Sequence, residues 1–200
     1  QIPLHPPSKE HNSKSFENKR KIGENDSNVC GYIRKDNAEE FATYTKNHNL
    51  AISMQTHSSI FETNAFLINR NPTLIEYAAF MGSINIFKYL IDNGIKLTPS
   101  LWLYAIHSKN MEIIHILEEK KIQPEDETFE ECLFESIKCH HFEMTDYILN
   151  TIMKNQNRNK DRLISKSFKF SNYNYFPDEM GVDFNLFYEL CKNDYHIIVE

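Results

Sequence analysis

The residues best suited to chemistry are two cysteines and two histidines in the third quarter of the chain. Cys132 and Cys139 lie seven positions apart, and His140 and His141 follow directly. Cysteine sulfur and imidazole nitrogen are both good zinc ligands. However, seven residues make two helical turns, so both sulfurs can simply face a helix interface. The sequence has no Cys-x-x-Cys pair to complete a site. We interpret these residues as packing and turn residues, expect no cofactor, and keep a metal site as the alternative.

Patterns that would indicate catalysis are weak. A cysteine–histidine nucleophile needs a thiolate, a nearby base and an oxyanion hole, and no motif places these together. Gly-x-Gly and Gly-Lys-Ser/Thr are absent from the sequence, which argues against a phosphate-binding loop. The sequence therefore favours a protein that is not an enzyme. The alternative is an enzyme or enzyme accessory built on residues 150–183, which contain an aromatic-rich run at 168–176.

Composition narrows the class of protein further. Hydrophobic residues make up 40% of the 200, and the formal net charge is −6 at pH 7. The acidic balance argues against nucleic-acid binding. Because no apolar run approaches the roughly 18 residues that a membrane helix needs, we expect no membrane insertion. The cysteines are few and scattered, so we expect free thiols and an intracellular, cytoplasmic location.

The chain divides at its N-terminal end. Residues 1–25 are polar and poor in large apolar side chains, so we expect a flexible segment there. Residues 26–200 are expected to form the folded domain. The start lacks an initiator Met and a signal-peptide core, and the end falls within an apolar-periodic stretch. We therefore expect an excerpt of a longer protein, with its last repeat truncated.

Three segments, 74–90, 101–117 and 132–148, align without a gap and indicate an internal repeat. The small-residue column holds Ala78, Ala105 and Ser136, and the column at the break holds Gly82, Lys109 and His140. After the break, apolar residues recur at helical spacing. Each segment therefore predicts a helix, a tight turn and a second helix. Since neither helix can bury its apolar face alone, neighbouring units must stack.

Weaker copies flank these three segments. Residues 32–44 fit the same frame, with Asp36 in the column of Gly82, and residues 186–198 fit it with Asn193 there. Longer insertions are expected near 50–72 and 150–183. Within the first insertion we expect another helix at 59–68. For the aromatic run in the second insertion, a loop and a short helix both remain open.

Residues 73–94 resemble an ankyrin repeat. The resemblance rests on the initial Thr73, the paired Ala78 and Ala79, the turn glycine Gly82, and the apolar second helix that ends before Gly94. The Pro and His of the usual start are missing, and several spacings are shorter than the usual repeat of about 33 residues. The β-hairpin fingers of typical ankyrin repeats are therefore expected to be short or absent.

More broadly, residues 29–198 resemble a divergent ankyrin-like domain family of unknown function that is expanded in certain protists. Residues 72–80 and 99–107 carry this resemblance most strongly. It implies an all-α, ankyrin-like α-solenoid of four to five stacked helix-turn-helix repeats and a role in protein–protein interaction. It supplies no catalytic residues.

In ankyrin-type arrays, the loops and first helices line a concave face that usually binds the partner, here an unidentified protein. The candidate contact residues, where they prove exposed, are Asn93, Lys96, Ser100, Trp102, Tyr104 and His107. Aromatic residues anchor interfaces, but in a small stack they more often fill gaps between repeats, and we favour the core for Trp102 and Tyr104. The alternative to a binding module is a structural spacer within a longer repeat protein.

Overall fold

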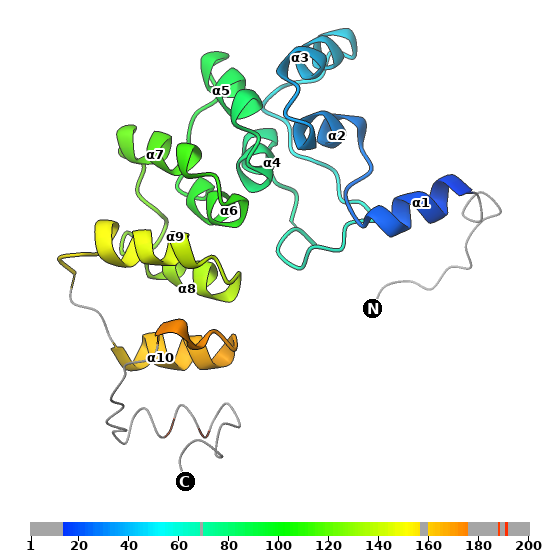
Figure 1. Ribbon diagram of the computed structural model, residues 1–200. Coiled ribbons are helices and arrows are strands. Elements are labelled where there is room, and N and C mark those ends of the chain that lie inside the picture. The colour runs from blue at the N-terminus through cyan, green and yellow to red at the C-terminus, as the bar shows by residue number, and fades with distance from the viewer. Residues whose placement is uncertain (1–13, 69, 157–159, 176–187, 189–190, 192–200) are drawn as a thin grey trace. The chain divides into compact units, whose positions relative to one another are not determined.

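The computed structural model describes residues 14–68, 70–156, 160–175, 188 and 191 (Figure 1). Within these residues every regular element is a helix, apart from one isolated β-bridge between Gln55 and Thr73. The predicted all-α class is therefore confirmed. The chain forms two compact units, Gln1–Lys96 and Leu97–Glu200. The weak copy expected at 186–198 lies outside the described residues, except for Tyr188 and Cys191.

The first unit contains α1 (Lys14–Ile22), α2 (Asn28–Arg34), α3 (Ala38–Asn47), α4 (Leu74–Met81) and α5 (Ile84–Asp92). Helix α2 packs against α3, and α4 packs against α5. The two pairs then lie side by side, because α2 contacts α4 and α3 contacts α5 (Figure 1). Each helix is too short to be stable in isolation, so this lateral packing holds the unit together.

The second unit contains α6 (Leu101–Ser108), α7 (Met111–Glu119), α8 (Glu130–Lys138) and α9 (Phe142–Tyr147), which continues into a π-helical segment, η2 (Ile148–Ile152). It ends with α10 (Lys160–Lys169) and a 3-10 turn, η3 (Tyr173–Tyr175). Helix α6 packs against both α7 and α8, and α8 packs against α9 and α10 (Figure 1). The first helices of successive pairs therefore form a continuous row within this unit.

The turn after each first helix has the same backbone conformation. One residue adopts a positive φ, between 50° and 71°, at Asp36, Gly82, Lys109, His140 and Ser171. At four of these turns, the next residue donates its N–H to the carbonyl five positions earlier, for example Ser83 to Ala78 at 2.9 Å and Asn172 to Ser167 at 2.8 Å. This is the Schellman end of a helix. The predicted break column is confirmed, and Ser171 extends it to α10.

The small-residue column lies at the centre of the packing. Ala78, Ala105 and Ser136 are each fully buried. Ser167 of α10 is fully buried as well and occupies the same position before its turn. A small side chain here allows adjacent first helices to approach closely, and large apolar residues on either side fill the remaining space. This close approach places the neighbouring polar side chains within reach of one another.

Two local predictions are wrong. Residues 59–68 form turns instead of a helix, because polar side chains there capture the backbone N–H groups that a helix would use. Ser59 accepts from the Phe61 amide at 3.2 Å, and Asn64 accepts from the Phe66 amide at 2.9 Å. Conversely, residues 14–22, expected to be flexible, form α1.

Two contacts hold α1 against the rest of its unit. The ring of Phe16 meets that of Phe61 edge to face at 5.2 Å, and Lys19 pairs with Asp26 at 2.9 Å. Both partners lie beyond the segment itself, so its polar composition did not reveal them. The remaining residues of the expected flexible segment, 1–13, lie outside the described part of the chain.

Candidate functional site

A polar cluster lies between α6 and α8. Helix α6 provides His107, and α8 provides Glu135 together with Cys139 at its C-terminal cap. The two helices pack against each other, and the cluster residues lie one to three positions from the fully buried small residues Ala105 and Ser136. Glu135 and Cys139 are four positions apart, which places them on the same face of α8. The local repeat pattern therefore explains why these three side chains meet.

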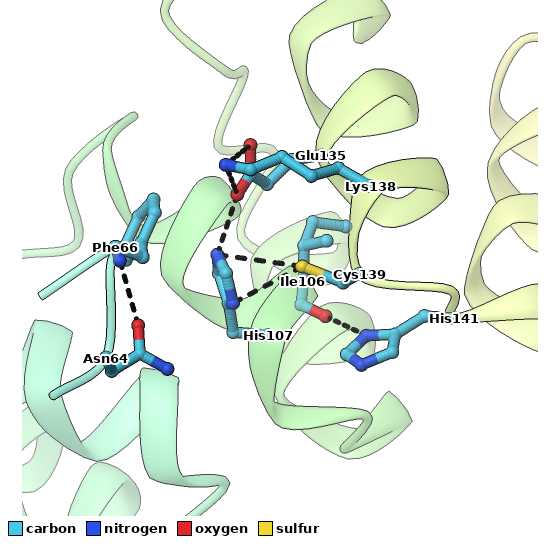
Figure 2. Close-up of polar contacts among 8 residues, drawn as sticks. All are labelled: Asn64, Phe66, Ile106, His107, Glu135, Lys138, Cys139 and His141. Atoms are coloured by element: carbon cyan, nitrogen blue, oxygen red, sulfur yellow. Dashed lines mark hydrogen bonds and ion pairs between the residues drawn. The ribbon is translucent and has the colours of Figure 1, made fainter. Parts of the chain in front are cut away.

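The three side chains offer nitrogen, oxygen and sulfur atoms to a common centre. His107 Nε2 lies 3.1 Å from Glu135 Oε1. The sulfur of Cys139 lies 3.5 Å from His107 Nδ1 and 4.0 Å from Nε2. One ligand atom from each residue can be chosen so that all lie within 4.8 Å of one another. Figure 2 shows the imidazole linked to both the carboxylate and the sulfur.

The cluster is largely shielded from solvent. The side chains of His107 and Glu135 are 11% and 16% exposed. Lys138 closes the outer side, with its Nζ 2.8 Å from Glu135 Oε1 and 3.1 Å from Oε2. Burial alone would raise the pKa of Glu135, but hydrogen bonds with His107 and Lys138 and the lysine charge lower it overall. The carboxylate is therefore ionised at neutral pH.

The thiol of Cys139, unlike the carboxylate of Glu135, is not ionised at neutral pH. Burial, with the nearby Glu135 charge, raises the pKa of Cys139 to about 11. The residue also caps the C-terminal end of α8, where the helix dipole disfavours an anion. A reactive cysteine needs surroundings that stabilise its thiolate. The Cys139–His107–Glu135 arrangement therefore looks like a catalytic triad in connectivity but does not provide an activated nucleophile.

The four residues singled out by the sequence do not form one site. Cys132 is fully buried, and burial raises its pKa. His140 is exposed in the turn, with its ring 6.3 Å from that of Phe142. His141 Nδ1 donates to the carbonyl of Ile106 at 2.8 Å. Cys139 belongs to the cluster described above, and these other three residues do not.

Sequence reasoning missed Glu135 as a site residue and did not join His107 to Cys139. The available signal was the register of the repeats. In the first unit, Arg34 and Tyr77 occupy the positions that His107 and Glu135 occupy in the second, and Arg34 donates to the Tyr77 hydroxyl at 3.0 Å. Comparing these positions between adjacent repeats would have indicated that side chains meet there.

The structure separates the candidate contact residues into exposed and buried groups. Asn93 and Lys96, in the first unit, are exposed. Asn93 donates from its side chain to the Tyr89 carbonyl at 2.8 Å. In the second unit, Ser100 is half-buried, with its hydroxyl 2.9 Å from that of Thr98. These three residues leave polar groups at or near the surface.

Trp102 and Tyr104 are core residues, which confirms the interpretation favoured for them and removes them from the candidate contact residues. Trp102 is 1% exposed and Tyr104 is 6% exposed. The indole N–H of Trp102 donates to the Ile122 carbonyl at 2.7 Å, and its ring meets that of Phe129 at 4.8 Å. Helix α6 is apolar around most of its circumference, so its aromatic residues fill the core of the unit. His107 belongs to the polar cluster.

No protein-family model matches the sequence, and no curated protein matches it. In the part of the chain that the structure describes, none of the helices combines the length and the apolar character needed to cross a membrane. Inferences about function therefore rest on the repeat pattern and on the geometry of individual residues.

Proposed function

We propose that the chain is an ankyrin-like α-solenoid that serves as a non-enzymatic protein–protein interaction module. The observation that carries this proposal is one hydrogen bond that recurs between adjacent helix pairs. In each case, the side chain that follows the positive-φ turn residue donates to a carbonyl three positions before the turn of the preceding pair. The instances are Ser83 to Ile33, His141 to Ile106 and Asn172 to Ile137.

This recurrence supports a repeat because the three donors differ in chemistry but occupy the same position. A hydroxyl, an imidazole and an amide each satisfy a carbonyl near the end of the neighbouring first helix. Buried carbonyls need such partners, so the bond fixes how one pair sits on the next. Units that contact mainly their neighbours are the defining property of solenoids, which present extended surfaces for binding.

The exposed residues near the turns are the proposed contact surface. In the first unit, Asn93 and Lys96 lie just after α5 and present an amide and an ammonium group. In the second unit, the half-buried Ser100, just before α6, is a separate candidate. The free thiols of Cys30, Cys132, Cys139 and Cys191 support a reducing, intracellular location. The step from a repeat fold to binding is one of analogy, so it needs a direct test.

The test is affinity capture from lysate of the source cell, with three matched variants. Lys96→Glu and Asn93→Lys alter the proposed surface, and Lys154→Glu is a control because Lys154 is exposed elsewhere. We expect one protein to be retained by the wild type and by the control but lost with the surface variants. All variants should melt at the wild-type temperature.

Two outcomes would contradict the proposal. Equal capture by the wild type and the surface variants would remove Asn93 and Lys96 from the contact surface. Ala105 is fully buried, so Ala105→Phe should disrupt the packing around it. If the wild type captures no more protein than this variant does, the structural-spacer alternative is favoured.

A further inference from the structure

We propose that His107, Glu135 and Cys139 form a zinc-binding site that links α6 to α8. Each residue contributes one ligand atom, and these atoms lie within 4.8 Å of one another. In tetrahedral zinc sites the bonds are about 2.0–2.3 Å long, so ligand atoms lie about 3.3–3.8 Å apart. In this structure, His107 Nε2 lies 3.1 Å from Glu135 Oε1 and 4.0 Å from Cys139 Sγ. One distance is slightly below this range and the other slightly above it. Binding requires side-chain rotations that bring the three ligand atoms, now within 4.8 Å of one another, into this range.

The backbone already provides the arrangement that such a site requires. Glu135 and Cys139 are four positions apart at the end of α8 and share one face, while His107 faces them from α6. Helices α6 and α8 pack directly against each other, and the fully buried Ala105 and Ser136 lie close in sequence to the three ligands. The ligands are therefore supported by fully buried residues on both sides.

The chemistry of the three donors favours zinc over calcium or magnesium. Calcium and magnesium prefer oxygen ligands, whereas a thiolate together with an imidazole and a carboxylate suits zinc. Binding forms Zn–N, Zn–O and Zn–S bonds and displaces water from the hydrated ion. The thiol proton of Cys139 is released to solvent, and the Nε2 proton of His107 moves to Nδ1 by exchange with solvent. A water molecule completes the four-coordinate shell. The step involves no change of oxidation state.

Lys138 competes with the metal ion for the carboxylate of Glu135. Its ammonium group contacts both oxygens of Glu135, and its side chain is 45% exposed. When zinc binds Oε1 of Glu135, the Lys138 ammonium group keeps its hydrogen bond to Oε2 or turns into solvent. Removing this positive charge should therefore strengthen metal binding, whereas a purely structural hydrogen-bond cluster predicts no such effect.

The experiment is titration of the full, chelator-treated chain with Zn²⁺ and, as a spectroscopic probe, Co²⁺. We expect one ion per chain, with the thiolate-to-cobalt absorption and the strong visible bands of a tetrahedral site. Cys139→Ser should abolish the thiolate absorption. His107→Ala and Glu135→Gln should each weaken zinc affinity by about tenfold or more. Lys138→Met should strengthen it.

Two controls remove similar groups elsewhere. His115→Ala and Cys191→Ser change an exposed histidine and an exposed cysteine, and both should bind zinc as the wild type does. Absence of cobalt binding by the wild type would overturn the proposal, and so would a thiolate absorption that persists in Cys139→Ser. If a ligand variant fails to fold, the wild-type cobalt spectrum and the response of Lys138→Met still decide the question.

Discussion

Individual polar side chains at equivalent positions connect one helix pair to the next. Asn172 shows this most clearly, because it is 2% exposed and its Nδ2 donates to the Ile137 carbonyl at 2.9 Å. Its Oδ1 has no hydrogen-bond partner among the described residues. The Nδ2 atom of this amide thus makes a structural hydrogen bond, whereas its Oδ1 atom is buried without a partner and carries a desolvation cost.

Replacing Asn172 with Ala should leave the buried Ile137 carbonyl without its donor. Loss of such a partner costs about 1–3 kcal/mol. We expect the free energy of unfolding, measured by urea denaturation, to fall by an amount toward the lower end of this range, because the substitution also removes the desolvation cost of Oδ1. Asn174→Ala is the matched control, since Asn174 is exposed, and it should change stability by less than about 0.5 kcal/mol. Equal effects of the two substitutions would contradict the proposed link.

Asp26 should make stability depend on pH. Partial burial alone would raise its pKa, but hydrogen bonds from Lys19 and Ser59 and the lysine charge lower it below 3.8 overall. Because the folded pKa is lower than the unfolded one, the contribution to stability is complete above about pH 3.8 and is lost as the pH falls through the folded value.

Carboxyl NMR titration of the folded protein can test this expectation. The pKa of Asp26 should lie below 3.8 and should rise in Lys19→Met, which removes the ion pair. Ser59→Ala should raise it by a smaller amount. A wild-type pKa at or above 3.8 would show that Lys19 and Ser59 do not stabilise the carboxylate in solution.

At the scale of elements, the positive-φ residues provide a matched pair of substitutions. Lys120 and Lys121 are adjacent exposed lysines at the end of α7, but Lys120 has φ −79° and Lys121 has φ 56°. A non-glycine residue in the left-handed region is strained by about 1–2 kcal/mol. Glycine removes this strain, although it costs about 0.5–1 kcal/mol in chain entropy.

We therefore expect Lys121→Gly to stabilise the protein slightly and Lys120→Gly to destabilise it. The two variants should differ by about 1 kcal/mol or more in the free energy of unfolding, measured by chemical denaturation. The charge change is the same in both, so the difference isolates the backbone. A larger loss of stability in Lys121→Gly would contradict the left-handed assignment.

The sequence predicted the elements well where periodicity and turn residues agreed. The helices of the three central pairs follow from apolar spacing and from the column of Gly82, Lys109 and His140. The helix predicted at 59–68 is wrong although the apolar spacing there suits a helix. The side chains of Ser59 and Asn64 accept hydrogen bonds from nearby backbone N–H groups instead. Helix α10 was not predicted, since its turn residue is Ser171 and only the backbone reveals its positive φ.

The candidate site was less predictable than the elements. The residue type of Cys139 marked it as a candidate, but its sequence neighbours His140 and His141 are not part of the cluster that it joins. His107 is 32 positions away, and it meets Cys139 because α6 and α8 pack against each other. Such contacts depend on the alignment of side chains between repeats, which residue type alone does not provide. The core interpretation of Trp102 and Tyr104 is confirmed, because α6 is buried on several sides.

At the scale of the whole molecule, helices pack mainly against those close to them in the chain. In the first unit α2 contacts α3 and α4, and in the second α8 contacts α6, α9 and α10. Stability in such an arrangement is approximately a sum of local terms and neighbour terms. A defect in one helix should therefore weaken its own surroundings most, with progressively smaller effects on helices that do not contact it.

Ala105→Phe tests this distribution of stability. Ala105 is fully buried in α6, so the larger side chain should cost about 1–3 kcal/mol through overpacking. Hydrogen exchange should accelerate most in α6 and α8, which pack directly against each other, and least in α2 and α3 of the first unit. Ala65→Phe is the control because Ala65 is exposed, and its exchange pattern should match the wild type. If Ala105→Phe instead accelerates exchange equally in every described helix, the chain unfolds as a single cooperative block, and additive stability of the solenoid type is excluded.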